Sequence, residues 1–543
     1  MKRELTICCV MAVICLWGCS ENSTRILPGG THSGSVVASA GQAVIITKYG
    51  KVAGYLDGGL YIFKGIPYAR AERFMPPLEP EPWDNIRSSR AYGPSCPQGA
   101  RTGWASDEMA FAFDWDDGHP GEDCLRLNIW TPGLTDGIKR PVMVWLHGGG
   151  YSAGSAQELP SYDGAALAAK GDVVLISLNH RLNVLGFLDL SAFGEKYAQS
   201  GNAGMLDIVA ALQWIRDNVT AFGGDPGNVT VFGQSGGGGK VSTLLTAPSA
   251  AGLFHKAIIQ SGSMTSAMDQ KYSRRIGVAV VQELGLQPSE INKLQDVPYE
   301  DLLAAGEKAV AKVKEAAARE GVEQLIFGWA PTVDGIFLTR QPFTETVSEH
   351  ARNIPVIIGT TLHEFLASAY LPALKNMTVE QAKTELKKIY RDRTDAFIDA
   401  LGKAYPDFKP ADLFDIDIRF RPEAIRQATL MANQKGASVY MYLFTWESPV
   451  MDGLLRSMHC MELPFVFRNI ERCRNMTGGG DEARKLAEKM SGAWLHFART
   501  GSPQEPSLPA WEPFNPVSGA TMIFDTECKI SYHHDKELMN LIK

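Results

Sequence analysis

The sequence lacks the features that mark several large classes of protein. No basic tract stands out among its 543 residues, and the net charge of −7 argues against nucleic-acid binding. No spacing of cysteine and histidine resembles a metal site. No internal repeat is present, and the one low-complexity linker lies near the N-terminus. Hydrophobic content of 45% and charged content of 21% are ordinary for a globular protein with a large core.

An apolar run near the N-terminus is too short to span a bilayer as a stable helix. It covers Leu5 to Trp17 and ends at Gly18-Cys19, which resembles a bacterial lipobox. We expect residues 1–18 to be a signal peptide of the lipoprotein type and Cys19 to carry the lipid; the alternative is an ordinary secretory signal. In both cases the mature protein is exported, to the cell envelope or otherwise secreted. Membrane contact is expected through the anchor alone.

The rest of the chain predicts a tether followed by one large α/β domain. Residues 19–40 are rich in Ser, Gly, Thr and Asn and predict a flexible tether. Strands then alternate with helices over 41–543 without an obvious domain break. A small antiparallel sheet is expected over 44–64. Apolar runs predict strands at 141–147, 172–179, 229–232, 256–260, 354–359 and 438–445, and helices are expected at 206–219, 299–320, 379–401 and 483–500.

Cysteines outside the signal suggest limited cross-linking. Of the nine cysteines, five lie in the expected α/β domain: Cys96, Cys124, Cys460, Cys473 and Cys528. An exported chain can form disulfides. We expect Cys96 to pair with Cys124, which closes a loop rich in Trp, Asp and Gly. The other three leave at least one thiol unpaired unless it bonds between chains, and their pairing stays open.

The most informative stretch runs from Val229 to Val241. It begins with β-branched and aromatic residues that suit a buried strand, turns sharply at residues 233–237, and continues into a helix expected from Lys240 to Thr246. Strand, G-x-S-x-G and helix form the context of a nucleophile elbow. The glycines that flank the serine avoid steric clashes in so tight a turn. The N-terminus of the following helix stabilises a developing oxyanion. Ser235 is therefore the candidate nucleophile.

A second G-x-S-x-G match occurs at residues 150–154 and places Ser152 at its centre. It follows the strand-like run 142–146, but a glycine tract intervenes and no helix pattern begins at once. We therefore interpret Ser152 as a loop serine in a glycine-rich turn. Ser152 remains the next residue to consider should Ser235 fail as the nucleophile.

A serine nucleophile needs a histidine base, which in turn needs a carboxylate to fix its tautomer. His459 is the best of eleven histidines because it lies in a loop after an expected strand. His147, His180 and His363 are weaker candidates, since another motif or packing explains each. Glu364 follows another buried strand and is the candidate acid. Serine, acid and histidine then occur in the order expected for an α/β-hydrolase.

A glycine run supplies the expected oxyanion hole. Leu146-His147-Gly148-Gly149-Gly150-Tyr151 follows an early sheet strand. Consecutive glycines let backbone N–H groups approach an ester oxygen without obstruction by side chains. The run could serve as a plain loop, but its pairing with a downstream elbow favours the catalytic interpretation.

From about Thr47 to Phe524 the chain resembles the type-B carboxylesterases of the cholinesterase/carboxylesterase family. The resemblance rests on several separate motifs in the right order: 63–69, 122–128, 147–150, 179–181, 201–207, 221–226, the elbow, 260–262 and 497–501. It implies the α/β-hydrolase fold, with a large, mostly parallel central sheet flanked by helices. It also implies two-step acyl transfer on a small-molecule ester, without metal or cofactor. The oligomeric state is left open.

The resemblance also implies individual roles. Ser235 would be the nucleophile, Glu364 the acid and His459 the base, and Ser261 would hydrogen-bond to the acid and base. The N–H groups of Gly149, Gly150 and Gly236 would hold the oxyanion, and Cys96 would be bonded to Cys124.

The sequence departs from the family pattern at the elbow. The family usually has Glu before the nucleophile and Ala after it, where this chain has Gln234 and Gly236. Gln234 removes a buried charge, and Gly236 predicts a looser oxyanion geometry because it frees the backbone. The neighbourhood of the acid, Leu362-His363-Glu364-Phe365, also differs from the commoner Asp-Glu-Gly.

Three other functions compete with hydrolysis of small or aryl esters. Adhesion members of the family bind partners without catalysis, but they typically lack the nucleophile that this chain retains. A lipase would need a large apolar lid, which no stretch identifies. A cholinesterase is disfavoured because no cation site is recognisable. Trp104 and Trp115 could line the mouth of a gorge, although packing explains them better.

Overall fold

The computed structural model describes residues 35–39, 41–99, 106–322, 328–343 and 347–542. The expected signal peptide (1–18), Cys19, most of the 19–40 tether and Trp104 lie outside these ranges. Within 35–39, Val37 pairs with Leu56 through two backbone hydrogen bonds of 2.8 Å. The end of the expected tether is therefore paired to the domain.

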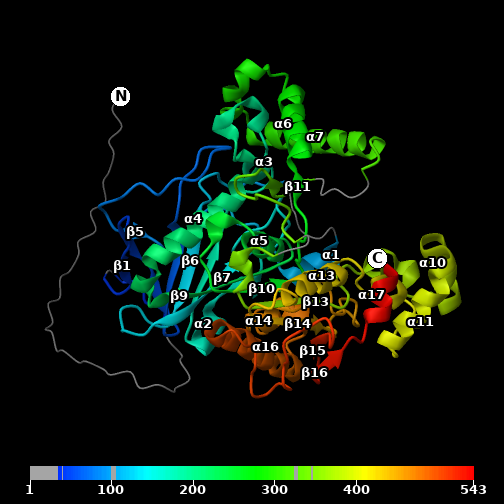
Figure 1. Ribbon diagram of the computed structural model, residues 1–543. Helices are drawn as coiled ribbons and strands as arrows, with labels where there is room; N and C mark the ends of the chain where they lie inside the picture. The colour runs from blue at the N-terminus through cyan, green and yellow to red at the C-terminus, as the bar shows by residue number, and fades with distance from the viewer. Residues whose placement is uncertain (1–34, 40, 100–105, 323–327, 344–346, 543) are drawn as a thin grey trace, which may run out of the picture.

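A central sheet dominates the described structure, as Figure 1 shows. Its eleven strands run in the order β16-β15-β14-β13-β10-β9-β7-β8-β6-β4-β3. Every neighbouring pair from β15 through to β8 is parallel, and the pairs at the two margins are antiparallel. This confirms the α/β-hydrolase fold with a mostly parallel sheet. The strands of this sheet are β3 (Tyr55–Asp57), β4 (Leu60–Pro67), β6 (Arg126–Thr131), β7 (Arg140–Leu146), β8 (Val174–Leu178), β9 (Gly224–Gln234), β10 (Lys256–Gln260), β13 (Val356–Thr361), β14 (Val439–Phe444), β15 (Ala520–Phe524) and β16 (Lys529–Tyr532).

Side chains of each central strand alternate between two separate hydrophobic cores. On β7, Val142 and Val144 pack into one core, whereas Met143 and Trp145 pack into the other. Successive side chains of a strand point to opposite faces of the sheet. A strand that is apolar at every position therefore contributes side chains to the cores on both faces. Helix α4 (Ala203–Asn218) packs into the first core, and α16 (Asp481–Thr500) packs into the second. Figure 1 shows these helices on opposite sides of the strands.

The N-terminal strands differ from the antiparallel sheet expected over 44–64. Strands β1 (Val44–Ile46) and β2 (Lys51–Ala53) are antiparallel, but β5 (Arg87–Ser88) adds to β2 in parallel. Strands β3 and β4 join the large sheet instead. The small sheet is therefore mixed, because a strand from distant sequence completes it. A further pair, β11 (Met268–Asp269) and β12 (Thr332–Val333), is parallel.

The long helices agree with expectation except at two places. Helix α7 covers Tyr299–Arg319, close to the expected 299–320. The stretch expected as 379–401 is broken at Arg391, which has a φ of 51°, into α10 (Val379–Tyr390) and α11 (Thr394–Ala404). Helix α5 spans Gly236–Leu244 and begins directly after Ser235, earlier than expected. The remaining α-helices are α1 (Asp107–Phe113), α2 (Ala165–Gly171), α3 (Asn183–Phe187), α6 (Gln270–Glu283), α8 (Glu349–Arg352), α9 (Ala367–Tyr370), α12 (Asp412–Asp415), α13 (Phe420–Ala432), α14 (Leu463–Val466), α15 (Arg474–Thr477) and α17 (Lys536–Ile542).

A buried ion pair ties the loop after β8 to α4. Arg181 Nη2 lies 2.6 Å from Asp207 Oδ1, and the two side chains are 5% and 0% exposed. We expect Asp207→Ala to lower the free energy of unfolding by about 3–5 kcal/mol, because it leaves a buried guanidinium without its counter-charge. Urea unfolding followed by circular dichroism measures this. Asp217→Ala, at the exposed pair with Arg216, is the control and should change stability by less than about 1 kcal/mol.

Candidate active site

Ser235 lies at the junction of β9 and α5. Strand β9 ends at Gln234, Ser235 is the N-cap of α5, and its φ of 57° and ψ of −124° are unusual for a residue with a side chain. Its N–H donates to the Gln260 carbonyl at 2.8 Å, which ties the turn to the next strand. The turn thus holds Ser235 in a strained conformation at the carboxyl end of the sheet.

Glycines around Ser235 allow contacts that no other residue would permit. A Cβ on Gly233 would lie 2.6 Å from the carbonyl carbon of Gly237, and a Cβ on Gly237 would collide with the Leu146 carbonyl. A Cβ on Gly236 would lie 2.5 Å from the Gly150 nitrogen, closer than real Cβ contacts come. Gly236 therefore brings the 149–150 loop closer to the elbow. The looser geometry expected for Gly236 is not what the structure has.

We expect Gly236→Ala to lower kcat by roughly tenfold or more, because the added methyl would push the Gly150 backbone off its position beside Ser235. This estimate is modest against the 100- to 1,000-fold cost of removing one oxyanion donor outright. Steady-state hydrolysis of a p-nitrophenyl ester measures it. Gly480→Ala is a control for the loss of a glycine, since Gly480 has a φ of −75° and its Cβ would meet nothing within 4 Å. An unchanged kcat in Gly236→Ala would show that the loop moves without penalty.

The expected base and acid are in direct contact. His459 Nδ1 lies 2.5 Å from Glu364 Oε2, and both side chains are buried. The His459 backbone N–H also donates to the Glu364 carbonyl at 2.8 Å, and the Thr361 N–H donates to Glu364 Oε1 at 3.0 Å. The loops after β13 and β14 are therefore joined at both side chain and backbone. This contact fixes one nitrogen of the imidazole against a carboxylate.

Two further buried carboxyls surround this pair. Burial, reinforced by the charge of Glu364, raises the pKa of Asp417 and of Glu462 to about 7 each. Glu462 Oε1 accepts from Gln260 Nε2 at 3.1 Å, and Asp417 accepts from the first N–H groups of α13. Because both groups retain protons to near neutral pH, the acidic cluster carries less negative charge than its composition suggests.

Gln234 connects the elbow to the base. Its amide nitrogen lies 3.2 Å from Nε2 and 3.3 Å from Nδ1 of His459, and its oxygen accepts from Cys460 Sγ at 3.2 Å. A neutral amide thus occupies the position where the family usually carries a carboxylate. The residue before the nucleophile therefore contacts the base without adding negative charge.

Two aromatic rings also pack against the imidazole. Phe365 stacks on His459 with ring centroids 4.7 Å apart, and Phe420 of α13 lies 5.4 Å away. Phe365 is 41% exposed although it directly follows the buried Glu364. The site thus presents an aromatic face to solvent beside the base.

The expected oxyanion glycines lie next to Ser235. Gly149 and Gly150 have φ values of 79° and 62°, which glycine adopts readily. A Cβ on Gly148 would lie 3.5 Å from Ser235 Cβ, which places the loop against the serine. Among the described residues, nothing accepts a hydrogen bond from the N–H of Gly149, Gly150 or Gly236. Three backbone donors are therefore available beside the hydroxyl.

The second serine has none of this geometry. Ser152 is exposed in a turn, where its N–H donates to the Gly149 carbonyl at 3.3 Å, and no helix follows it. Its carbonyl accepts from the Asn183 side chain at 3.2 Å. The structure places Ser152 in the glycine-rich loop, as expected.

Ser261 departs from the expected role. Its Oγ is buried without a hydrogen-bond partner in the described structure, so the expected bonds to Glu364 and His459 are not formed. Both Glu364 oxygens are already engaged, by Thr361 and by His459. Ser261 instead uses its backbone, donating to the Gly359 carbonyl at 2.8 Å with a φ of 46°.

The expected disulfide is also absent. Cys96 and Cys124 are both free and buried, although a hydrogen bond between the two thiols helps to raise the pKa of Cys124. The two side chains are therefore neighbours, as a disulfide requires, but the bond is not formed. Cys460, Cys473 and Cys528 are free as well.

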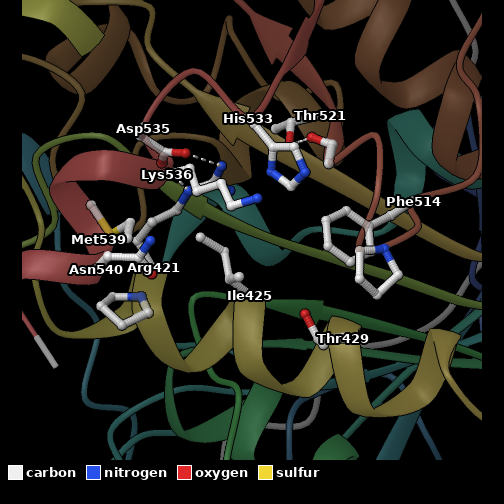
Figure 2. A pocket seen from close by; sticks show the side chains of 13 residues that line it. Arg421, Ile425, Thr429, Phe514, Thr521, His533, Asp535, Lys536, Met539 and Asn540 are labelled. Carbon is white, nitrogen blue, oxygen red and sulfur yellow. Dashed lines mark hydrogen bonds and ion pairs between the residues drawn. The ribbon is translucent and has the colours of Figure 1, made fainter.

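Two hollows lie apart from this site. One, of about 210 Å³, is shown in Figure 2, where the ion pair of Arg421 and Asp535 lies beside Ile425 and Met539. Another, of about 730 Å³, includes His363 and Arg456. Neither is lined by Ser235 or His459. His363 is buried and hydrogen-bonded to Ser457 at 2.7 Å, which fits a packing role.

Neither a metal-binding cluster nor a membrane-spanning helix occurs in the described ranges. No group of three or more His, Cys, Asp and Glu side chains there is placed to hold a metal ion. No helix in the same ranges combines the length and apolar character needed to cross a membrane.

Sequence reasoning missed several residues of the site. Lys240 and Glu158 are buried near the oxyanion loop, and Glu462, Asp417 and Phe420 surround the acid and base. A charged residue inside a glycine-rich or apolar run was the available signal for Lys240 and Glu462. Asp417 and Phe420 carry no such signal, because only the fold brings α13 to the base.

A large mixed sheet, a strained serine at a strand–helix turn and a buried histidine–glutamate contact define a hydrolase of the α/β-hydrolase fold. The chain belongs to the Carboxylesterase family, whose model matches residues 41–541, and it is a carboxylic ester hydrolase.

Curated relatives agree over nearly the whole chain. The para-nitrobenzyl esterase of Bacillus subtilis (strain 168) is 36% identical and covers 91% of this chain and 97% of its own length. The phenmedipham hydrolase of Pseudarthrobacter oxydans is 33% identical, over 89% and 94%.

Solved structures give the same result. An esterase from anaerobic Clostridium hathewayi that can hydrolyse aliphatic aromatic polyesters matches with a TM-score of 0.83 and 40% identity, covering 93% of this chain and 98% of that one. A Geobacillus stearothermophilus carboxylesterase matches with a TM-score of 0.73 and 34% identity, over 92% and 100%.

Proposed function

We propose that this carboxylesterase cleaves small and aryl carboxylic esters through an acyl-enzyme on Ser235. His459 acts as general base, Glu364 orients it, and the N–H groups of Gly149, Gly150 and Gly236 hold the oxyanion. The observation that carries the proposal is the 2.5 Å contact between His459 and Glu364 beside the strained elbow serine.

The chemistry follows from the placement of these groups. Glu364 accepts the Nδ1 proton of His459, so Nε2 is the unprotonated nitrogen that takes the proton of Ser235 as its oxygen attacks the ester carbonyl. The developing oxyanion meets backbone donors that have no other acceptor in the described structure. His459 then protonates the leaving alcohol. Water repeats the cycle, releasing the acid and restoring Ser235.

The aromatic face supports a preference for aryl esters. Phe365 stacks on His459 and is 41% exposed, so an aromatic ring in the substrate can pack against it as the ester reaches Ser235. The names of the Bacillus, Pseudarthrobacter and Clostridium relatives point to aromatic substrates for those proteins.

The experiment is a panel of p-nitrophenyl and alkyl esters, from acetate to long chains, with the mature protein, Ser235→Ala and Phe365→Leu. We expect turnover of short and aryl esters, no turnover by Ser235→Ala, and a loss of aryl preference in Phe365→Leu. Equal inertness of both the mature protein and Ser235→Ala would favour a non-catalytic binding protein. A preference confined to long-chain, water-insoluble esters would favour a lipase.

Export and cross-linking complete the proposal. Residues 1–18 direct export, Cys19 carries a lipid anchor, 19–40 act as a tether and 41–543 form the catalytic domain. In an oxidising compartment Cys96 and Cys124 become a disulfide, since they are buried neighbours. Palmitate labelling of the wild type and Cys19→Ala tests the anchor, and non-reducing peptide mass spectrometry tests the disulfide.

A further inference from the structure

Lys240 is a fully buried lysine that the proposed mechanism does not use. It follows four consecutive glycines and is therefore the first residue of α5 with a side chain. Its Nζ donates to the His147 carbonyl at 2.9 Å. His147 directly precedes the glycine run of the proposed oxyanion hole, so this bond fixes the start of that run.

The same amino group lies near the other end of the run. Nζ is 5.8 Å from the centre of the Tyr151 ring, within the range of a cation–π contact. Tyr151 directly follows Gly150, and its ring packs edge-on against Phe187 with centroids 5.2 Å apart. Lys240 therefore contacts the residues on both sides of Gly148–Gly150.

Helix α5 offers a surface of glycines to this loop. Cβ atoms on Gly236, Gly237 and Gly239 would meet Gly150, the Leu146 and His147 carbonyls, and the Tyr151 hydroxyl. With no side chains along this contact, the helix and the loop lie almost backbone to backbone. The Lys240 side chain crosses from the helix to the start of the loop, and Thr243 of the same helix hydrogen-bonds to Tyr151 at its end.

Lys240 is an expensive residue to bury. Burial lowers the pKa of its amino group to about 7, and the nearby Glu158, whose own pKa burial raises to about 8, only partly opposes this. A buried charge of this kind costs stability unless hydrogen bonds and a counter-charge compensate for its desolvation. A lysine retained there is better explained by what it does for the site than by stability.

We propose that Lys240 is a positioning residue of the oxyanion hole: it holds the His147 carbonyl and the Tyr151 ring so that the Gly149 and Gly150 N–H groups stay beside Ser235. This inference rests on the function proposed above. Without the amino group, the start of the loop loses its tie to α5 and the donors no longer hold one geometry. The effect falls on the transition state, where the oxyanion exists, and little on substrate binding.

The test compares Lys240→Met with Lys256→Met in the mature protein. Methionine keeps most of the length of the side chain and removes the donor. Lys256, on β10, is a largely buried lysine bonded to Asn228 outside the site, so it controls for loss of a buried amine. Measurements are kcat and KM for p-nitrophenyl acetate, the Ki of an alkyl trifluoromethyl ketone, and the melting temperature.

For Lys240→Met we expect kcat to fall roughly 10- to 100-fold, somewhat less than the cost of removing an oxyanion donor. KM should stay within about threefold. The ketone forms a tetrahedral adduct with the serine, so its Ki should rise in parallel with the loss of kcat/KM. The melting temperature should fall by no more than a few degrees, because the buried His147 carbonyl loses its donor. Lys256→Met should keep the wild-type kcat and Ki.

Two outcomes would overturn the role of Lys240. One is a kcat within twofold of wild type in Lys240→Met. The other is a fall in kcat together with an unchanged Ki, which marks a merely structural residue. If Ser235→Ala is inactive in the same assay, either outcome leaves the proposed function standing. Full activity in Ser235→Ala would overturn both.

Discussion

Ser235→Ala should reduce kcat/KM for p-nitrophenyl acetate by at least about 10⁵-fold, leaving only the residual catalysis of a site without its nucleophile. Ser235 lies in a strained turn between β9 and α5. The proposed base, acid and oxyanion glycines all act on its hydroxyl. Alanine can adopt the same turn with little change in packing. The expected loss is therefore chemical, and the melting temperature should stay close to that of the wild type.

The matched control is Ser152→Ala, which lies in the other G-x-S-x-G sequence. Ser152 is exposed in a turn without a following helix, so its removal should leave kcat/KM within about threefold. Retention of wild-type activity by Ser235→Ala would remove the elbow from the mechanism. Loss of activity in Ser152→Ala instead would move the nucleophile to that loop.

Glu364→Gln should lower kcat by roughly 10⁴-fold, the scale seen when the orienting carboxylate of such a triad becomes an amide. In the wild type, Glu364 Oε2 lies 2.5 Å from His459 Nδ1, while Oε1 accepts from the Thr361 N–H. An amide can keep the bond to Thr361 but would present its N–H₂ to the imidazole. That favours the tautomer in which Nε2 carries the proton and is unable to accept one from Ser235.

The measurement is kcat for the same ester, with circular dichroism to confirm the fold. Glu488→Gln, a carboxylate paired with Lys170 away from the site, is the control and should retain wild-type kcat. A Glu364→Gln enzyme within tenfold of wild type would mean that another group orients the base. Asp417 and Glu462, whose carboxyls lie near Glu364, would then be the residues to test.

The sequence predicted the elbow well because its evidence is local. A Cβ on Gly233 or Gly237 would collide with neighbouring backbone, so both positions need glycine. Both lie within two residues of Ser235, so the pattern is visible in a short stretch of sequence. The start expected for this helix, Lys240, is later than the observed start of α5 because four glycines look like a loop. They form helix because the loop at 146–151 lies directly on them, which is a tertiary contact.

Other parts of the site could not be read from the chain. Ser261 was expected to bond to the acid and base, but its Oγ is left unpartnered by a turn with a φ of 46°. The tightening effect of Gly236 depends on how close Gly150 comes, which no sequence pattern reports. The pairing of Val37 with Leu56, and of Arg87–Ser88 with β2, could not be predicted either. Each pairing depends on a partner that is distant in sequence.

If Ser235 carries the acyl group during turnover, the covalent intermediate can be trapped. The mature protein is mixed with a slowly deacylating p-nitrophenyl ester, quenched in acid and analysed by peptide mass spectrometry. We expect a burst of nitrophenol close to one per active site and the acyl mass on the peptide that contains Ser235. An acyl group on Ser152, or turnover without any covalent adduct, would contradict this expectation.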